Sequence, residues 1–134
     1  MADNLYKLKI VSPERIFFEG MVSMVEFTAS EGEVGIYKNH IPMTVIIAPG
    51  ILTMHLEEEI KIAALHSGFA EILPDAITIL AEVVEWPEEI DLSRATAARD
   101  RAEERLREKN PETDLARADT ALHRAAARIH AAGK

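Results

Sequence analysis

The chain has 134 residues, of which 48% are hydrophobic, enough for one domain or for a smaller domain with an appended element. It contains no cysteine, which excludes disulfides, thiol nucleophiles and thiolate metal sites. The formal net charge of −8 is uneven, because residues 1–89 carry −10 and residues 90–134 carry +2. The acidic first part should repel nucleic acid, and the arginines of the second part lack aromatic neighbours for base stacking, so we expect no nucleic-acid partner.

No apolar run is long enough to span a bilayer, since the best candidate, MTVIIAPGIL, is interrupted by Pro49 and Gly50. The N-terminal stretch MADNLYKLKI has no basic region followed by an apolar one, and it is neither Arg-rich nor Ser-rich. We therefore expect a chain that begins in the cytosol and is not inserted directly into a membrane.

From Leu5 to Glu85, apolar residues recur at every second position in short runs, as in Tyr6, Leu8 and Ile10. This period is typical of strands with one buried face. Turn signals such as Pro49-Gly50 separate the runs, and no helix-length segment intervenes. Residues 1–87 are therefore predicted to form one domain, an antiparallel β-sandwich or flattened β-barrel.

After Trp86-Pro87 the apolar period becomes helical and alanine dominates. Asp91 is positioned to cap a first helix, Asn110-Pro111 ends it, and Thr113 or Asp114 caps a second. Residues 88–134 are therefore predicted to form an antiparallel helical hairpin. The two expected buried stripes are Leu92, Ala95, Ala98, Ala102 and Leu106, and Leu115, Ala118, Leu122, Ala125 and Ile129.

The expected hairpin interface is mostly alanine, whose methyl group buries much less area than a leucine side chain. We therefore expect a weakly held hairpin that can open or change its partner surface at a cost of a few kcal/mol. A static hairpin packed through alanine fits the periodicity equally well.

Catalytic and metal-binding patterns are missing from the sequence. The histidines are scattered without HxH or HExxH spacing, so we predict no metal site. There is no GxSxG motif and no phosphate-binding glycine loop, so we predict no catalytic residue. The histidines are His40, His55, His66, His123 and His130.

Arginines of the two predicted helices are spaced to meet in one region. Arg94 and Arg101 share a face of the first helix, and Arg124 and Arg128 share a face of the second. In an antiparallel pair all four guanidinium groups can approach the start of the first helix, where they would suit an anion such as a nucleoside triphosphate. The alternative is that these arginines form solvated pairs with neighbouring acids such as Asp100 and Glu103.

Two stretches carry a resemblance to a known family: SEGEVGIYKNHIPM (residues 30–43) and HSGFAEILPDAITILAE (residues 66–82), followed by DLSRA (residues 91–95). Along its whole length the chain resembles the epsilon subunit of bacterial F-type ATP synthases. The resemblance implies a barrel followed by two helices and a non-catalytic role in the central stalk. It also implies a peripheral position at the cytoplasmic face of the bacterial plasma membrane.

The implied partners are the gamma subunit and the membrane rotor ring, which bind the barrel, and the catalytic beta and alpha subunits. The helices of bacterial members can extend along gamma and restrain ATP hydrolysis. The loop that contains Glu31 and His40 (residues 30–40) resembles the region that faces the ring and gamma, and Glu31 is the best single candidate for a ring contact. The alternative is a turn that serves only the structure of the barrel. The implied contacts with an acidic loop of beta are Arg99, Arg105 and Arg107.

The resemblance requires no cofactor, but it implies ATP, possibly with Mg²⁺, as a regulatory ligand of the folded hairpin. Glu85 and Asp91 would accept the adenine amino group or act as caps, Ile90 would pack against the base, and the arginines would neutralise the phosphates. The matched positions are Glu85, Ile90, Asp91, Arg94, Ala95, Arg101, Arg124 and Arg128. Rival interpretations are a free-standing nucleotide-sensing module and, less favoured, an enzyme built on a β-barrel.

Overall fold

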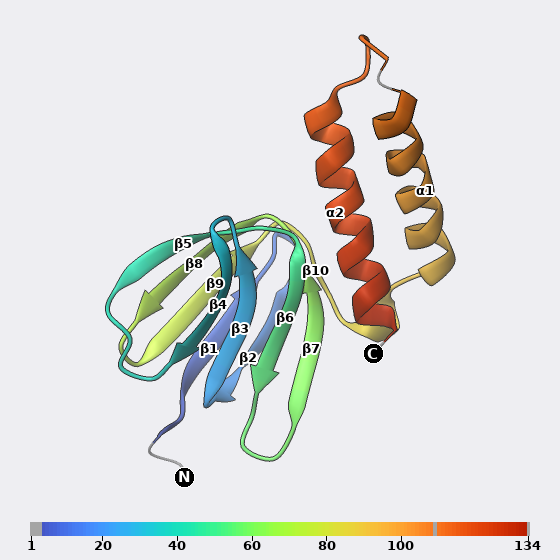
Figure 1. Cartoon of the computed structure of the whole chain (residues 1–134). Coiled ribbons are helices and arrows are strands. Elements are labelled where there is room, and N and C mark those ends of the chain that lie inside the picture. The colour runs from blue at the N-terminus through green and yellow to red at the C-terminus, as the bar shows by residue number, and fades with distance from the viewer. Residues whose placement is uncertain (1–3, 109, 134) are drawn as a thin grey trace.

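A computed structural model describes residues 4–108 and 110–133. It consists of a β domain followed by a helical hairpin, as Figure 1 shows. The β domain contains β1 (Tyr6–Val11), β2 (Ile16–Val22), β3 (Met24–Ala29), β4 (Gly32–Tyr37), β5 (Met43–Ile47), β6 (Gly50–His55), β7 (Ile60–Leu65), β8 (Gly68–Leu73), β9 (Ala76–Ala81) and β10 (Val84–Glu85). A 3₁₀ turn, η2 (Pro87–Glu89), leads into α1 (Leu92–Glu108) and α2 (Leu115–Ala132). The predicted fold class is confirmed.

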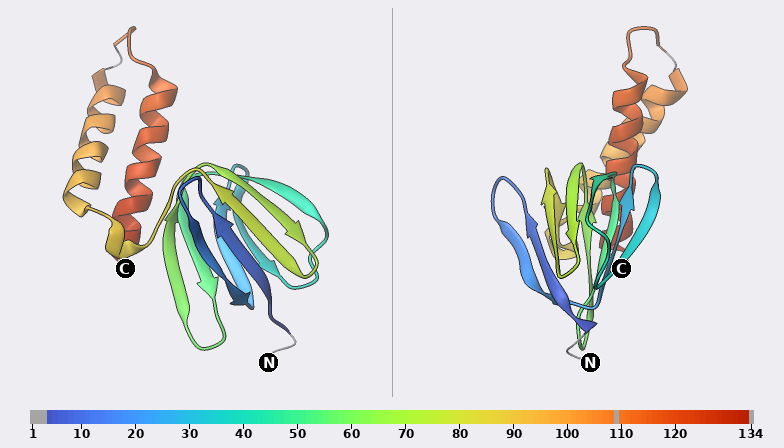
Figure 2. Two further views of the ribbon diagram at one scale, coloured as in Figure 1. Left: turned by 180° about the vertical axis from the view of Figure 1, so that it is seen from behind. Right: turned by 90° about the vertical axis from the view of Figure 1, so that its left-hand side faces the viewer.

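The strands pair in the order β10-β7-β6-β3-β5-β8-β9-β1-β2, and β4 pairs with β3. Figure 2 shows that the sheet bends into two facing layers. Every pairing between described strands is antiparallel, as predicted, except that of β1 with β9, which is parallel. No turn links these two strands, so no hairpin geometry dictates their relative direction.

The core of the β domain lies between the two layers and is formed by the inward residues of the alternating pattern. Leu8, Ile10, Phe27 and Ile79 are fully buried there. Tyr6 keeps its hydroxyl inside this core by donating a 2.6 Å hydrogen bond to the carbonyl of Ile36, and burial raises the pKa of the phenol. The alternation therefore produces one continuous apolar centre with its polar exception satisfied.

Both helix starts follow the predicted capping. The Asp91 carboxylate accepts a hydrogen bond from the backbone N–H of Arg94 at 3.1 Å, and that of Asp114 accepts one from Arg117 at 3.0 Å. The predicted burial of Leu92 and Leu115 is wrong, since both are about half exposed. Each lies in the first turn of its helix, where the partner helix covers little of the side chain. The buried helical residues are Ala95, Ala102, Ala118, Ala125, Ala127 and Ala131.

The hairpin stands at one end of the β domain, with α2 between the β domain and α1 (Figures 1 and 2). The helix α2 contacts β6, β7 and η2, whereas α1 contacts mainly α2. The contact between the hairpin and the β domain therefore depends on α2.

Neither helix crosses a membrane in the part of the chain that the structure describes, because none there is both long and apolar enough to do so.

Candidate functional site at the domain junction

The segment between β10 and α1, residues 86–91, is called the link here, and an aromatic stack and an ion pair hold it on the β domain. Trp86 stacks on Phe17 of β2 with ring centroids 4.2 Å apart. Glu89 forms a 2.7 Å ion pair with Arg15 and accepts a 2.9 Å hydrogen bond from the backbone N–H of Trp86. These donors hold the pKa of the Glu89 carboxyl below its usual range. The chain therefore enters α1 from a defined position on the β domain.

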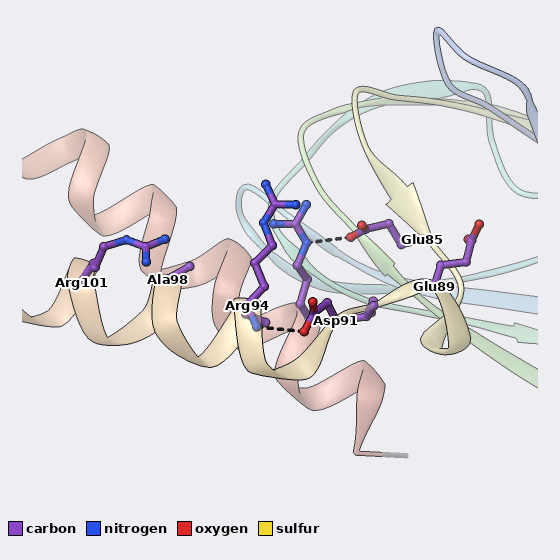
Figure 3. Close-up of a pocket in the computed structure, with 9 residues that line it drawn as sticks. Glu85, Glu89, Asp91, Arg94, Ala98 and Arg101 are labelled. Atoms are coloured by element: carbon purple, nitrogen blue, oxygen red, sulfur yellow. Dashed lines mark hydrogen bonds and ion pairs between the residues drawn. The ribbon is translucent and has the colours of Figure 1, made fainter.

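A cavity of about 330 Å³ lies where β10, the link, α1 and α2 meet. Its size is at the lower end of the range typical of small-ligand sites. Figure 3 shows the residues that line it, with acidic groups toward the β domain and Arg101 farthest along α1. The lining residues are Glu85, Glu89, Ile90, Asp91, Arg94, Ala95, Ala98, Arg101 and Arg128.

Seven of the eight predicted ATP-site residues line this cavity: Glu85, Ile90, Asp91, Arg94, Ala95, Arg101 and Arg128. The eighth, Arg124, is not among them. Its guanidinium instead donates a 3.2 Å hydrogen bond to the hydroxyl of Ser67, in the β7–β8 turn. The structure thus brings three of the four predicted arginines to the cavity and places the fourth between α2 and the β domain.

Charges around the cavity are only partly paired. Arg128 forms a 2.7 Å ion pair with Glu85, which joins α2 to β10. Among the residues that the structure describes, no acidic group pairs with the side chains of Arg94 or Arg101. These two guanidinium groups lie two turns apart on one face of α1. They are available to an anion without loss of an existing ion pair.

The two acids named in the alternative interpretation, Asp100 and Glu103, pair with Arg99, which is not one of the four arginines. It contacts Asp100 at 3.2 Å and Glu103 at 3.3 Å, and it does not line the cavity. The four arginines expected at the site form no ion pair with either acid. Solvated pairing therefore explains one arginine of α1 and not the cluster at the junction.

Sequence reasoning missed four residues of this region. Ala98 lies one turn after Arg94, so helical spacing could have indicated it. Glu89 lies in the link, where its side chain accepts a hydrogen bond from the backbone N–H of Trp86, and the sequence only suggests such a cap. Ser67 and His66 come from a distant turn, and no local pattern in the sequence predicts that α2 packs against them.

The predicted partner residues lie away from the cavity. Glu31 is exposed in the turn between β3 and β4. His40 is half-buried between β4 and β5 and donates through Nδ1 to the carbonyl of Ile41 at 2.8 Å. Arg105 and Arg107 are exposed near the end of α1, at the far end of the hairpin from the β domain.

Comparison with known families gives matches along nearly all of the chain. Residues 5–87 match the model of the β-sandwich domain of the ATP synthase delta/epsilon chain, and residues 88–133 match that of its long α-helix domain. The ATP synthase epsilon chain of Caldanaerobacter subterraneus is 42% identical over 133 residues, covering 98% of this chain and 96% of the relative. That of Syntrophobacter fumaroxidans is 42% identical over 134 residues, covering 100% and 99%.

Solved structures share the fold at low sequence identity. A chain of the Euglena gracilis mitochondrial ATP synthase, in an assembly of OSCP, F1 and c-ring, aligns with a TM-score of 0.84 at 21% identity, covering 98% of this chain and 82% of that one. A chain of the central stalk and c-ring of the Tetrahymena thermophila mitochondrial enzyme aligns with a TM-score of 0.63 at 15% identity, covering 95% and 96%. From the family matches and the bacterial relatives, the chain belongs to the epsilon chains of F-type ATP synthases, which are subunits of that complex and not its catalytic ones.

Proposed function

We propose that the chain is a regulatory subunit of the central stalk that couples the rotor to catalysis. In this proposal the β domain attaches to the rotor, and the hairpin restrains ATP hydrolysis when it extends. ATP at the domain junction favours the folded hairpin. The observation that carries the proposal is the cavity itself, because its walls come from β10, the link, α1 and α2 together. A ligand that fills it stabilises only the arrangement in which all four meet.

The charges of the cavity support one orientation of ATP. Glu85 and Asp91 lie at the end near the β domain, where carboxylates can accept hydrogen bonds from the adenine amino group. Arg94 and Arg101 lie further along α1 and suit phosphate oxygens, because each is permanently charged and presents several N–H donors. The nucleotide would therefore lie along α1, with its base beside Ile90.

The packing of the hairpin supports a movable element. Every helical side chain that is fully covered in the described part of the two helices is an alanine. Each contributes little apolar area compared with a buried leucine, which stabilises by about 1.5–3 kcal/mol. A hairpin held in this way can exchange its contacts with the β domain for contacts elsewhere at modest cost.

An apolar row on the outer face of the β domain supports attachment to the gamma subunit. The strand registers place Ile46, Phe69, Leu80, Val11 and Ile16 side by side across β5, β8, β9, β1 and β2. Four of them are 39–62% exposed, and contiguous exposed apolar side chains mark protein interfaces. The solved assemblies named above contain a c-ring or a central stalk, which agrees with a rotor position for this fold.

The remaining predicted partner residues lie on the turns beside β4 and on α1. Glu31 and His40 would contact the rotor ring and gamma from the turns that flank β4. Arg105 and Arg107, with Arg99, would approach an acidic loop of a catalytic beta subunit, near alpha, once the hairpin extends. Such a subunit would lie at the cytoplasmic face of the plasma membrane as a peripheral protein.

Calorimetric titration of the isolated chain with ATP tests the nucleotide site. We expect saturable binding that is roughly tenfold to hundredfold weaker in Arg94→Ala and in Arg101→Ala, because a hydrogen bond to a charged group contributes about 1.5–3 kcal/mol. Arg107→Ala is the matched control, since it removes an exposed arginine of the same helix outside the cavity. Equal affinity in all four proteins would refute the site.

A further inference from the structure

A buried histidine faces the contact between the hairpin and the β domain. His66 follows β7 and is 1% exposed. Neither of its ring nitrogens has a hydrogen-bond partner among the described residues, and Nε2 lies 3.6 Å from the nearest carboxylate oxygen of Glu85. Protonation of a buried imidazole that has no hydrogen-bond partner is unfavourable, because the charged ring loses its contact with water and gains no compensating hydrogen bond.

The groups around His66 already carry a net positive charge. The charged groups that act on it are Glu85 of β10 and two arginines of α2, Arg124 and Arg128. Arg128 is bonded to Glu85 at 2.7 Å, and Arg124 is bonded to the neighbouring Ser67 at 3.2 Å. With one carboxylate and two guanidinium groups, the cluster has a charge of +1 when His66 is neutral and +2 when it is protonated.

Both arginines belong to the hairpin, whereas His66, Ser67 and Glu85 belong to the β domain. The charge of His66 therefore acts directly on the contact that holds the two parts together. We propose that protonation of His66 releases the hairpin from the β domain, so that the docking of α2 is sensitive to pH. This property belongs to the chain alone and does not depend on ATP or on a partner subunit.

The direction of the effect follows from the two states of the histidine. In the docked state, burial, together with Arg128 and Arg124, lowers the pKa of His66 from 6.5 to about 4, although Glu85 acts in the opposite sense. Release of α2 exposes the ring to water and removes both arginines, so the pKa returns toward its ordinary value. The released state therefore binds a proton that the docked state excludes. Docking is therefore strongest above about pH 6.5 and weakens as pH falls toward 4, by at most tenfold per pH unit.

Distance measurements between two spin labels on the full chain test this proposal. The chain has no cysteine, so labels can be attached through Glu71→Cys on β8 and Ala126→Cys on α2, both exposed. We expect one short distance at pH 7.5 and a growing longer component toward pH 5, with the ratio of the two populations changing by roughly tenfold or more. Circular dichroism at each pH checks that both domains remain folded.

The deciding variants change the histidines one at a time. His66→Gln has a side chain of similar size that does not titrate, so its distance distribution should be the same at all pH values. His66→Met serves the same purpose if the amide is not tolerated. His123→Gln alters an exposed histidine of α2 and should keep the dependence of the unsubstituted chain. A distribution independent of pH in the unsubstituted chain, or a dependence that persists in His66→Gln, would overturn the proposal.

Discussion

Asp91 has two roles that a single carboxylate can fill at once. Its side chain accepts the backbone N–H of Arg94 and so begins α1, and the same residue lines the junction cavity. A carboxylate has two oxygens with several acceptor positions, so capping leaves capacity for a ligand donor. The start of the helix and the wall of the cavity are therefore one feature of the structure.

Two substitutions separate these roles. Asp91→Ala removes the cap and should lower the thermal stability of the helical hairpin by about 1 kcal/mol, whereas Asp91→Asn keeps a good cap and should change it little. Thermal unfolding followed by circular dichroism at 222 nm measures the difference. Glu104→Ala, in the middle of α1, is the control. Equal stability of the alanine and asparagine variants would show that capping at Asp91 contributes nothing.

How far the site could be predicted depends on whether its residues share a local pattern. The cavity residues from Asp91 along α1 follow one another at helical spacing, so Asp91, Arg94 and Arg101 could be assigned from the sequence. The position of Arg124 could not be predicted, because it depends on the hydroxyl of Ser67 reaching α2 from a distant turn. The surroundings of His66 could not be predicted for the same reason, since Arg124 and Arg128 reach it from α2 and Glu85 from β10.

At the level of helices and strands, the hairpin has two capped helices, and the interface between them buries little apolar area. Both helices have a capping carboxylate, and their covered residues are small. Close approach of two backbones through alanine leaves no space for a larger side chain. The interface should therefore be sensitive to added volume although it buries little area.

A substitution at the interface tests this packing. Ala102 is buried in α1, and a leucine there should destabilise the hairpin by about 1–3 kcal/mol through overpacking. Ala97→Leu makes the same change at an exposed position of α1 and should have little effect. Denaturant unfolding of the two variants measures the difference. A hairpin that accepts Ala102→Leu without loss of stability would contradict the close packing.

The strands show where a period of two is sufficient and where it is not. Alternation identified the inward face of β1 and β9, whose Leu8, Ile10, Ile77 and Ile79 are buried. It did not reveal the parallel pairing of these strands, because pairing of distant segments has no local signal. The outer apolar row escaped notice for the same reason, since its members become neighbours only through the registers of five strands.

In the whole molecule, the proposed function assigns different roles to two parts of the structure. The apolar row binds the rotor, and the hairpin moves. The row lies on β5, β8, β9, β1 and β2, and α2 packs on β6 and β7 at the other end of the strand order. Attachment through the row therefore leaves the hairpin contact uncovered. In the proposed function, the hairpin would then change position while the β domain stays bound.

A single acidic substitution tests attachment. Phe69→Glu places a charge within the apolar row, between Ile46 and Leu80, and should weaken binding to the isolated gamma subunit by tenfold or more, because aromatic side chains often contribute over 1 kcal/mol to an interface. Ile60→Glu makes a similar change at an exposed residue of β7 outside the row and should bind normally. Loss of binding in both variants, or in neither, would argue against this surface.

The rate of ATP hydrolysis by the assembled enzyme tests the central claim most directly. Enzyme assembled with residues 1–87 should hydrolyse ATP faster than enzyme with the full chain, because the restraining helices are missing. A full chain carrying Arg94→Ala and Arg101→Ala should hydrolyse it more slowly, because ATP no longer favours the folded hairpin. Equal rates for all three assemblies, with the chain incorporated to the same extent in each, would contradict the account.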